Sequence, residues 1–201
     1  MLINKKIFFE DIKNNIIGVD EVGRGALCGP VVSCSVLLKK EILQFDLVNQ
    51  IDDSKKISEK KRIILSNFIK KYSNFHFGIA SNLEIDEINI LKATILSMKR
   101  SLKNFCNHKN EIKIDGQKTF HYSNKTSFIK KGDQKSIVIA SASILAKTFR
   151  DKLICSYDKQ YPEYGLCSNK GYGTQKHFKA IKHYGLTPIH RKSFLRKFFI
   201  Q

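Results

Sequence analysis

The spacing of apolar residues predicts strands and helices from about residue 16 onward. Short runs of valine, isoleucine and leucine have the length of buried strands, and longer segments with apolar residues three and four positions apart have the pattern of amphipathic helices. The predicted strands are Ile16–Val19, Pro30–Leu38, Phe75–Ala80, Glu111–Ile114 and Thr126–Lys130, and the predicted helices are Ser58–Tyr72, Leu91–Phe105, Ile137–Tyr157 and His177–Tyr184. Strands followed by alternating helices and strands favour a three-layer α/β or α+β fold.

Two features of this pattern give more specific expectations. A glycine-rich turn separates the first two strands, so they are able to pair as a hairpin. Ser58 stands where the N-cap of a helix is preferred. The apolar stripe of that helix is expected to be Ile63, Ile64, Phe68 and Ile69.

Length and composition fit one domain with a substantial core. The chain has 201 residues, 42% of them hydrophobic, with three prolines and no repeated or low-complexity segment. We expect a single domain over residues 1–201, with a basic C-terminal extension at about residues 160–201 packed on it. No apolar run approaches the roughly 20 residues of a membrane helix, and Glu10 and Asp11 interrupt the N-terminal segment before a signal-peptide core forms. A cytoplasmic location without membrane contact is expected.

The cysteines give a further expectation about redox state. The five cysteines, at positions 28, 34, 106, 155 and 167, include no C-x-x-C pair and are odd in number. This pattern favours reduced thiols in the core over a disulfide framework or a zinc site.

Positive charge is concentrated in the second half of the chain. Residues 116–201 contain 17 basic and 4 acidic side chains, against 19 and 14 in residues 1–115. The last 37 residues, from Gly165 onward, contain eight Lys or Arg and no acidic residue. Such a surface attracts a polyanion, most often a phosphate backbone and less often an acidic membrane or protein. A general bias towards lysine explains some of this charge, but it does not explain the missing acids.

The candidate chemistry is a set of carboxylates at turns. Asp20 and Glu21 follow the first predicted strand and precede the turn Gly23-Arg24-Gly25, and Asp115 and Asp133 each stand beside a glycine. Adjacent carboxylates resist joint ionisation unless a cation neutralises them, and Mg²⁺ and Mn²⁺ prefer oxygen ligands. Because neighbouring residues of a strand point to opposite faces, Asp20 and Glu21 reach one metal cluster only if the strand ends or bends there. One such acid alone is an ordinary turn residue, but together they favour a metal-dependent nuclease.

Several motifs resemble those of the type 2 bacterial ribonucleases H, the ribonuclease HII family. They are G-V-D-E-V-G-R-G at 18–25, D-D-S-K-K-I-S at 52–58, I-D-G-Q at 114–117, K-G-D at 131–133, A-S-A-S-I-L-A-K-T-F-R-D at 140–151, K-G-Y at 170–172 and H-R-K-S-F at 190–194. The resemblance extends from about Ile16 to Phe194. Arg24 distinguishes the first motif from the G-K-G form of the related ribonuclease HIII.

The resemblance implies a ribonuclease H-like fold, with a mixed five-stranded sheet flanked by helices and a helical C-terminal part. It implies a monomeric endonuclease that cuts the RNA strand of RNA–DNA hybrids and single ribonucleotides in duplex DNA, leaving 5′-phosphate and 3′-hydroxyl ends. Ribonucleotide excision repair and DNA replication are the implied settings. Asp20, Glu21, Asp115 and Asp133 would be the catalytic tetrad, holding Mn²⁺ or Mg²⁺ for attack by a metal-activated water.

The resemblance also assigns substrate contacts. Gly23, Arg24 and Gly25 would read the ribose 2′-hydroxyl, because glycine lets the backbone approach the sugar closely. Tyr172 would pack against the sugar at the ribonucleotide junction. His190 is either phosphate-binding or structural. The basic residues expected near phosphates are Lys55 or Lys56, Lys147, Arg191 and Lys192.

Three positions depart from the family pattern. Ala26 and Gly173 stand where the family commonly has proline, and Gln117 stands where it has asparagine. Without that proline the Tyr172 loop is expected to be more mobile, which would weaken junction specificity.

Two other interpretations stay open at this point. A non-catalytic, basic nucleic-acid-binding protein would account for the charge of +18, although it would not need four acids at turns. Another metal-dependent nuclease of the same fold, such as an integrase-like enzyme, would keep the carboxylates but lack the G-R-G and K-G-Y motifs.

Overall fold

The fold is built on a five-stranded sheet, and the computed structural model describes residues 5–105 and 109–196. The strands are β1 (Ile17–Val22), β2 (Val31–Leu38), β3 (Ser73–Ala80), β4 (Ile112–Asp115) and β5 (Thr126–Ile129). Their order in the sheet is β3-β2-β1-β4-β5. β1 pairs antiparallel with β2 as the predicted hairpin and β2 pairs antiparallel with β3, whereas β4 is parallel to both β1 and β5. The sheet is therefore mixed, as the family resemblance predicted.

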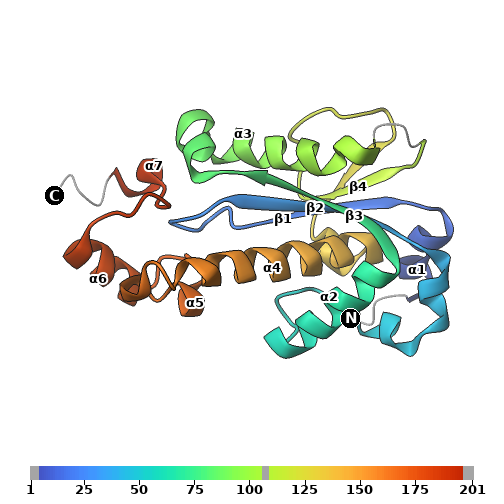
Figure 1. Ribbon diagram of the computed structural model, residues 1–201. Coiled ribbons are helices and arrows are strands. Elements are labelled where there is room, and N and C mark those ends of the chain that lie inside the picture. Colours follow the sequence, from blue (N-terminus) through green and yellow to red (C-terminus); the bar gives the residue numbers. More distant parts are fainter. Residues whose placement is uncertain (1–4, 106–108, 197–201) are drawn as a thin grey trace.

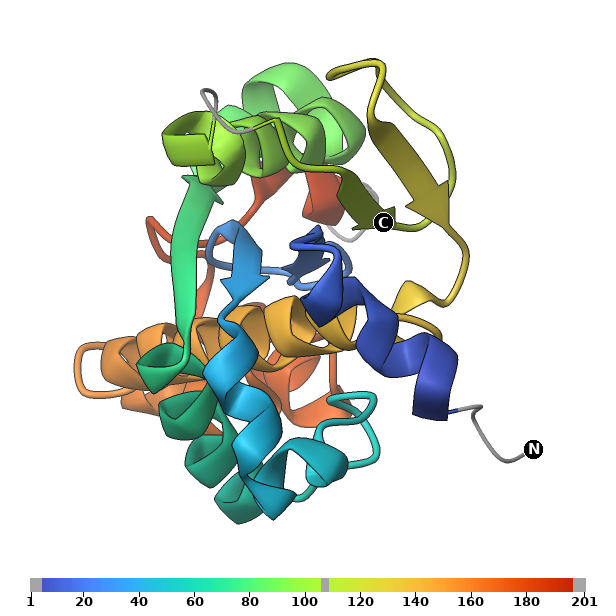
Figure 2. The ribbon, with the colours of Figure 1, turned by 90° about the vertical axis from the view of Figure 1, so that its right-hand side faces the viewer.

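Helices cover both faces of the sheet (Figure 1). They are α1 (Lys5–Lys13), α2 (Glu59–Lys71), α3 (Asn82–Leu102), α4 (Ile137–Tyr157), α5 (Leu166–Asn169), α6 (Gln175–Tyr184) and α7 (Lys192–Leu195). The view along the strands in Figure 2 shows α3 on one face and α4 on the other, with α1 and α2 on the α4 side. The predicted fold class, including a helical C-terminal part, is confirmed.

The central helix α4 fills the space between the sheet and α2. Its residues from Ile137 to Ala146 are all buried, so this part of the helix has no solvent face. Gly18 in β1 permits the close packing, because a Cβ atom there would lie 2.2 Å from the carbonyl carbon of Val138. The predicted helix boundaries, Ile137–Tyr157, are confirmed.

The second helix confirms its predicted cap but corrects its predicted stripe. The Ser58 side chain accepts a hydrogen bond from the Lys61 N–H, as an N-cap does. Ile69 is buried and Phe68 is partly buried against the core, as predicted, whereas Ile63 and Ile64 are 48% and 52% exposed and Leu65 is buried instead. Because α2 is an outer layer, only a narrow face of it packs against the core.

The third helix begins at Asn82 rather than at Leu91. Ser81 and Glu84 form a capping box at its start. Asn89 has a positive φ of 68° within the helix, and this kink changes the phase of the apolar pattern. The residues before the kink therefore do not continue the stripe from which the helix was predicted.

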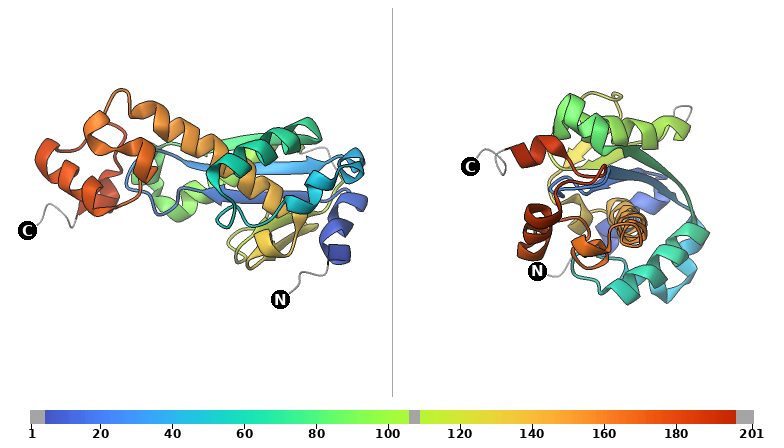
Figure 3. Two further views of the ribbon diagram at one scale, coloured as in Figure 1. Left: turned by 90° about the horizontal axis from the view of Figure 1, so that it is seen from below. Right: turned by 60° about the vertical axis from the view of Figure 1, so that its left-hand side comes forward.

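The C-terminal part packs at one end of the sheet (Figure 3). Its apolar residues contact the segment after β1 and the last turns of α4. The buried members of this cluster are Leu27, Cys28, Ile154, Tyr164, Leu166, Ala180, Ile181 and Leu195. The end of β1 and the C-terminal part are thereby brought together, although they are far apart in the sequence.

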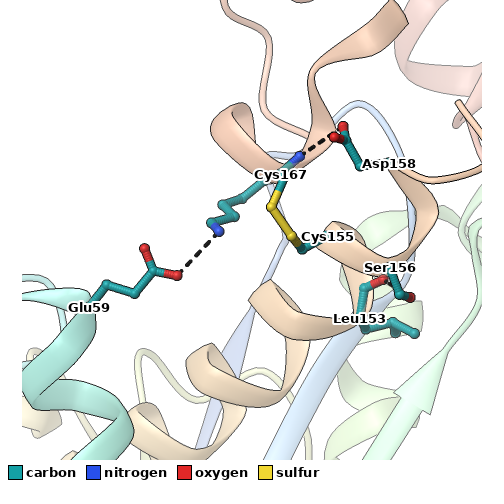
Figure 4. The surroundings of a disulfide bond; sticks show 7 residues. Glu59, Leu153, Cys155, Ser156, Asp158 and Cys167 are labelled. Carbon is teal, nitrogen blue, oxygen red and sulfur yellow. Dashed lines mark hydrogen bonds and ion pairs between the residues drawn. A yellow bond between two sulfur atoms is a disulfide. The ribbon is translucent and has the colours of Figure 1, made fainter. Parts of the chain in front are cut away.

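The cysteines differ from expectation at two positions. Cys155 at the end of α4 and Cys167 in α5 form a disulfide, with their Cα atoms 4.0 Å apart (Figure 4). The prediction of reduced thiols is wrong for this pair, because the chain folds back after α4 and brings α5 against the end of that helix. It is confirmed for Cys28 and Cys34, which are free and buried, and Cys106 lies outside the described residues.

None of the helices in the described part of the chain combines the length and the apolar character needed to cross a bilayer.

Candidate active site

Two parallel strands bring Asp20 and Asp115 to the same edge of the sheet. Val19 pairs with Ile114, so the next residue of each strand is one of these acids. β1 does not end at Val19 as predicted, since it continues to pair with β2 as far as Val22. Its pairing with β4 does stop at Val19, so residues 20–22 have a strand neighbour on one side only. This opening at the carboxyl ends of parallel strands is a common place for catalytic side chains.

A hydrogen bond from a backbone N–H connects the loop of Asp133 to the side chain of Asp115. Asp133 lies in the short helical turn Gly132–Gln134, directly before α4. The Gly132 N–H donates to Oδ1 of Asp115 at 2.6 Å. The loop that carries Asp133 is therefore held against the end of β4.

The four predicted carboxylates line one cavity of about 250 Å³. Its other lining residues include Lys55, Lys147 and Tyr172, which were also predicted as site residues. The remaining ones are Val22, Ser54 and Ser143. The two serine hydroxyls lie 3.0 Å apart, and the Ser143 side chain hydrogen-bonds Asp20. These serines were not predicted as site residues, although Ser54 lies in the motif at 52–58 and Ser143 in the motif at 140–151.

Burial makes this group of acids reluctant to ionise together. Burial raises the pKa of Asp20 well above its ordinary value, and the neighbouring charges of Glu21 and Asp115 raise it further. Burial also raises the pKa of Glu21, against the opposing effect of Arg24. The pKa of Asp133 is raised by burial and then by the carboxylates of Asp53 and Asp115. The cavity therefore holds more negative charge than the protein alone neutralises.

The donor set fits a hard divalent cation. Oε2 of Glu21 is buried and has no hydrogen-bond partner among residues 5–105 and 109–196, although a buried oxygen of this kind normally has one. Every acidic group in the cavity offers oxygen ligands, which Mg²⁺ and Mn²⁺ prefer. A cation bound by Asp20, Glu21, Asp115 and Asp133 would satisfy the orphaned oxygen and neutralise the crowded charges.

The Gly23-Arg24-Gly25 turn borders the cavity. Gly23 has a φ of +91°, and a Cβ atom there would lie 2.1 Å from Nε of Arg150, so only glycine fits. Gly25 is exposed, and a Cβ atom there would meet no atom within 4 Å. Arg24 is exposed and its Nη1 lies 3.3 Å from Oε1 of Glu21. The turn therefore combines an open backbone surface with a cation that faces the carboxylates.

Two buried arginines support this turn from below. Arg191 is fully buried, and its guanidinium donates to the carbonyls of Gly23, Arg24 and Gly29 at 2.7 to 2.9 Å. Arg150 is also fully buried and donates to three other carbonyls. Their acceptors are Pro30 at 3.0 Å, Lys170 at 2.9 Å and Cys28 at 3.1 Å. The expectation that Arg191 contacts a phosphate is corrected: the segment after α6 folds beneath the turn and places this side chain in the core.

The predicted lysines lie in different places. Lys55 and Lys147 line the cavity, and Nζ of Lys147 lies 2.8 Å from Oδ1 of Asp151. Lys56 does not line it, and its Nζ lies 3.9 Å from Oδ1 of Asp52. Lys192 is exposed and also lies outside the lining. Of these side chains, the structure brings only Lys55 and Lys147 to the carboxylates.

Tyr172 presents its ring to the cavity from the C-terminal part of the chain. Nζ of Lys147 and Cζ of Arg150 lie 5.8 and 5.6 Å from the centre of the ring. Cations at this distance from an aromatic face are attracted to it. The ring is thus held on the side of α4, next to the acids.

Comparisons with known proteins agree with these observations. A family model described as Ribonuclease HII matches residues 17–199. The ribonuclease HII of Clostridioides difficile (strain 630) is 47% identical over 180 residues, covering 89% of this chain and 69% of the relative. The ribonuclease HII of Fusobacterium nucleatum is 44% identical over 203 residues, covering 98% and 93%.

Solved structures share the fold at lower identity. RNase HII from Archaeoglobus fulgidus, solved in a complex with PCNA, has a TM-score of 0.76 at 21% identity and covers 92% of this chain and 95% of its own. Bst-RNase HIII in complex with Mn²⁺ has a TM-score of 0.66 at 17% identity, covering 85% and 62%. At these identities the likeness concerns the fold alone.

Proposed function

This chain belongs to the ribonuclease HII family and is therefore a ribonuclease H, and from this premise we propose its substrates and mechanism. The proposed substrates are RNA–DNA hybrids and duplex DNA that contains single ribonucleotides. The proposed products carry 5′-phosphate and 3′-hydroxyl ends. The observation that carries the proposal is the convergence of Asp20, Glu21, Asp115 and Asp133 in one cavity beside the Gly23-Arg24-Gly25 turn.

The four carboxylates are proposed to hold Mn²⁺ or Mg²⁺. The orphaned oxygen of Glu21 and the raised pKa values of its neighbours support this assignment. Mn²⁺ is also the ion bound in the Bst-RNase HIII structure of the same fold. When bound, divalent ions supply an activated water and stabilise the charge on the phosphorus centre and the leaving oxygen.

The remaining site residues are proposed to select and orient the nucleic acid. The exposed backbone at Gly25 and the Arg24 side chain lie where a ribose 2′-hydroxyl would be read. Tyr172 would pack against the sugar that follows it. Lys55 and Lys147 would contact phosphates at the border of the cavity.

Cleavage of a labelled RNA–DNA hybrid tests this function. With Mg²⁺ or Mn²⁺ the RNA strand is expected to be cut, whereas chelator should stop the reaction and an all-DNA duplex should stay intact. Binding of the hybrid without any cleavage would favour the non-catalytic nucleic-acid-binding protein instead.

The neighbouring lysines Lys55 and Lys56 provide a matched test of phosphate contact. Lys55→Ala is expected to weaken hybrid binding. The fall of log affinity with log salt concentration should become less steep by about 1, as loss of one phosphate contact makes it. Lys56→Ala removes the same charge outside the cavity and should leave the slope unchanged. Fluorescence anisotropy at several salt concentrations measures both, and equal effects of the two changes would contradict the placement of Lys55.

The raised pKa values predict how metal-free stability depends on pH. A carboxyl group whose pKa is higher in the folded state stabilises the fold below its unfolded pKa, and this contribution is lost as pH rises through the folded pKa. Asp20→Asn should therefore raise the melting temperature in chelator at pH 7 by about 3 °C, the shift that 1 kcal/mol gives in a chain of this size. At pH 4, where Asp20 is already protonated, the melting temperature of Asp20→Asn should differ less from that of the wild-type protein.

Scanning calorimetry or dye-based melting measures this effect. Asp46→Asn is the control, because Asp46 is exposed and lies outside the cavity. Mn²⁺ should stabilise the wild-type protein more than Asp20→Asn, since binding to the folded state adds to stability. A melting temperature of Asp20→Asn equal to that of wild type under every condition would refute the electrostatic account.

A further inference from the structure

A pair of buried histidines lies behind the loop that carries Tyr172. His177, in α6, is fully buried, and His190 is 2% exposed. Their Nε2 atoms are 3.1 Å apart. We call His177 and His190 the histidine pair, and the proposed cleavage chemistry uses neither residue directly.

The partners of the histidine pair fix the positions of its protons. A carbonyl oxygen only accepts, so Nδ1 of His177, 2.9 Å from the Tyr172 carbonyl, carries a hydrogen. A backbone N–H only donates, so Nδ1 of His190, 3.0 Å from the Thr187 nitrogen, is an acceptor, and the Thr187 hydroxyl, 2.8 Å from the same Nδ1, then acts as a second donor. Neutral His190 then carries its hydrogen on Nε2 and donates it to Nε2 of His177. Every ring nitrogen is satisfied when both rings are neutral.

The environment of the histidine pair favours these neutral forms. Burial lowers the pKa of His177. Burial and the neighbouring His177 lower the pKa of His190 to about 4. At neutral pH the hydrogen-bond chain therefore runs in one direction, from the Thr187 N–H through both rings to the Tyr172 carbonyl.

The same residues also resemble a metal site, since ligand atoms of Cys28, His177 and His190 lie within 4.8 Å of one another. Their protonation states do not suit a metal. Nε2 of His190 carries the hydrogen that its Nδ1 cannot hold, so a metal at this atom would have to displace that hydrogen and break the hydrogen bond between the two rings. Burial raises the pKa of Cys28 to about 11, which keeps the thiol protonated, and its Sγ hydrogen-bonds the Gly171 carbonyl at 4.0 Å. We therefore interpret the cluster as a set of hydrogen bonds that holds the carbonyls of Gly171 and Tyr172 in place.

The Tyr172 loop depends on contacts from outside itself. Lys170 has a φ of 51°, a left-handed conformation that is costly for a residue other than glycine and persists only where the surroundings impose it. Each carbonyl of residues 170–172 accepts a hydrogen bond from another segment, and the Tyr172 carbonyl also accepts one from the nearby Thr174 N–H at 2.9 Å. The donors are Nη1 of Arg150 to Lys170 at 2.9 Å, the Leu27 N–H to Gly171 at 2.8 Å and Nδ1 of His177 to Tyr172 at 2.9 Å.

We propose that His177 and His190 are positioning residues that set the orientation in which Tyr172 meets the substrate. The hydrogen bond from His177 fixes the direction of the Tyr172 carbonyl, and His190 fixes the His177 ring. The inference rests on the proposed function, in which Tyr172 packs against the sugar at the ribonucleotide junction. The pair therefore contributes to the preference for that junction and leaves the carboxylate chemistry unchanged.

Two substitutions at one position separate the two hydrogen bonds of His177. The asparagine amide reaches the place of Nδ1, so His177→Asn keeps a donor for the Tyr172 carbonyl. The glutamine amide reaches towards Nε2, so His177→Gln keeps a partner for His190 and loses that donor. The readout is kcat/KM on a duplex with one ribonucleotide, divided by kcat/KM on a long RNA–DNA hybrid. His183→Gln, at an exposed position of α6, is the control.

His177→Gln is expected to lower this ratio about tenfold, the effect of losing one hydrogen bond, and His177→Asn should restore most of it. Combining His177→Gln with Tyr172→Ala should lower the ratio no further than Tyr172→Ala alone. If wild type cuts neither substrate, the proposed function fails, whatever the variants do. If wild type cuts both and His177→Gln keeps the ratio, or loses both activities equally, the histidine pair does not position Tyr172.

Ring ¹⁵N–¹H correlation spectra of the wild-type protein test the pair without any substitution that could impair folding. We expect His177 as the Nδ1–H form and His190 as the Nε2–H form. An Nε2–H form of His177 would overturn the proposal. So would Nδ1–H forms of both rings together with one bound zinc per chain, since the cluster would then be a metal site.

Discussion

Replacing Asp115 by asparagine is expected to lower the rate of hybrid cleavage by about 10³-fold, because a ligand of the catalytic ions contributes several kcal/mol of charge stabilisation. Asp115 lies between the other acids: it is the last residue of β4, beside Asp20 in β1, and its Oδ1 accepts the hydrogen bond from the loop of Asp133. Asparagine keeps an oxygen for that hydrogen bond, so the fold should be retained. Single-turnover cleavage with saturating enzyme measures the loss.

Hybrid binding should survive the same change. Asp115→Asn removes a negative charge from the region that a phosphate approaches, so affinity in chelator is expected to stay the same or to increase. Asp52→Asn is the matched control, because it removes one charge at a residue that does not line the cavity, and it should change the rate less than about threefold. Undiminished cleavage by Asp115→Asn would remove this residue from the proposed site.

Of the substitutions proposed for this protein, Arg191→Ala is expected to reduce stability most, by about 3–5 kcal/mol in the free energy of unfolding. The guanidinium satisfies the carbonyls of Gly23, Arg24 and Gly29, and each buried acceptor left without a donor costs about 1–3 kcal/mol. Burial, together with the neighbouring Arg150, lowers the pKa of Arg191 to about 10. Keeping the buried guanidinium charged therefore costs free energy, which offsets part of the stabilisation from its three hydrogen bonds. Urea unfolding followed by circular dichroism measures the difference.

The next residue provides the control for Arg191. Lys192 is exposed, so Lys192→Ala should change the free energy of unfolding by no more than about 0.5 kcal/mol. The two residues carry the same charge and appear equivalent in the sequence. A loss below about 1 kcal/mol for Arg191→Ala would contradict its role as the support of the turn.

The sequence was informative where the signal is local. The apolar run of α4, the N-cap of α2 and the first hairpin follow from short-range patterns, and the observed elements agree with them. The convergence of the acids follows from strand order, because acids at the ends of neighbouring parallel strands meet at one edge. The family motifs implied a mixed five-stranded sheet in advance, whereas the strand order comes from the structure.

Tertiary contacts determined what the sequence could not show. Arg191 was predicted to bind phosphate at the surface. No local sequence pattern shows that the segment after α6 packs beneath the turn and buries this side chain. Two members of the stripe of α2 were misassigned, because burial depends on which face of the helix meets α4 and both Ile63 and Ile64 lie away from that face. Cys155 and Cys167 were not paired in the prediction, since their proximity arises only after the chain folds back.

The most direct test of the proposed nuclease is cleavage of a labelled DNA duplex that contains one ribonucleotide, beside an all-DNA duplex, with Mn²⁺ or Mg²⁺ and with chelator. We predict a metal-dependent cut on the 5′ side of the ribonucleotide, with 5′-phosphate and 3′-hydroxyl ends, and no cut in the all-DNA duplex. No cut at the ribonucleotide in the presence of metal, or equal cutting in chelator, would contradict the assignment of a metal-dependent, ribonucleotide-reading nuclease to this cavity.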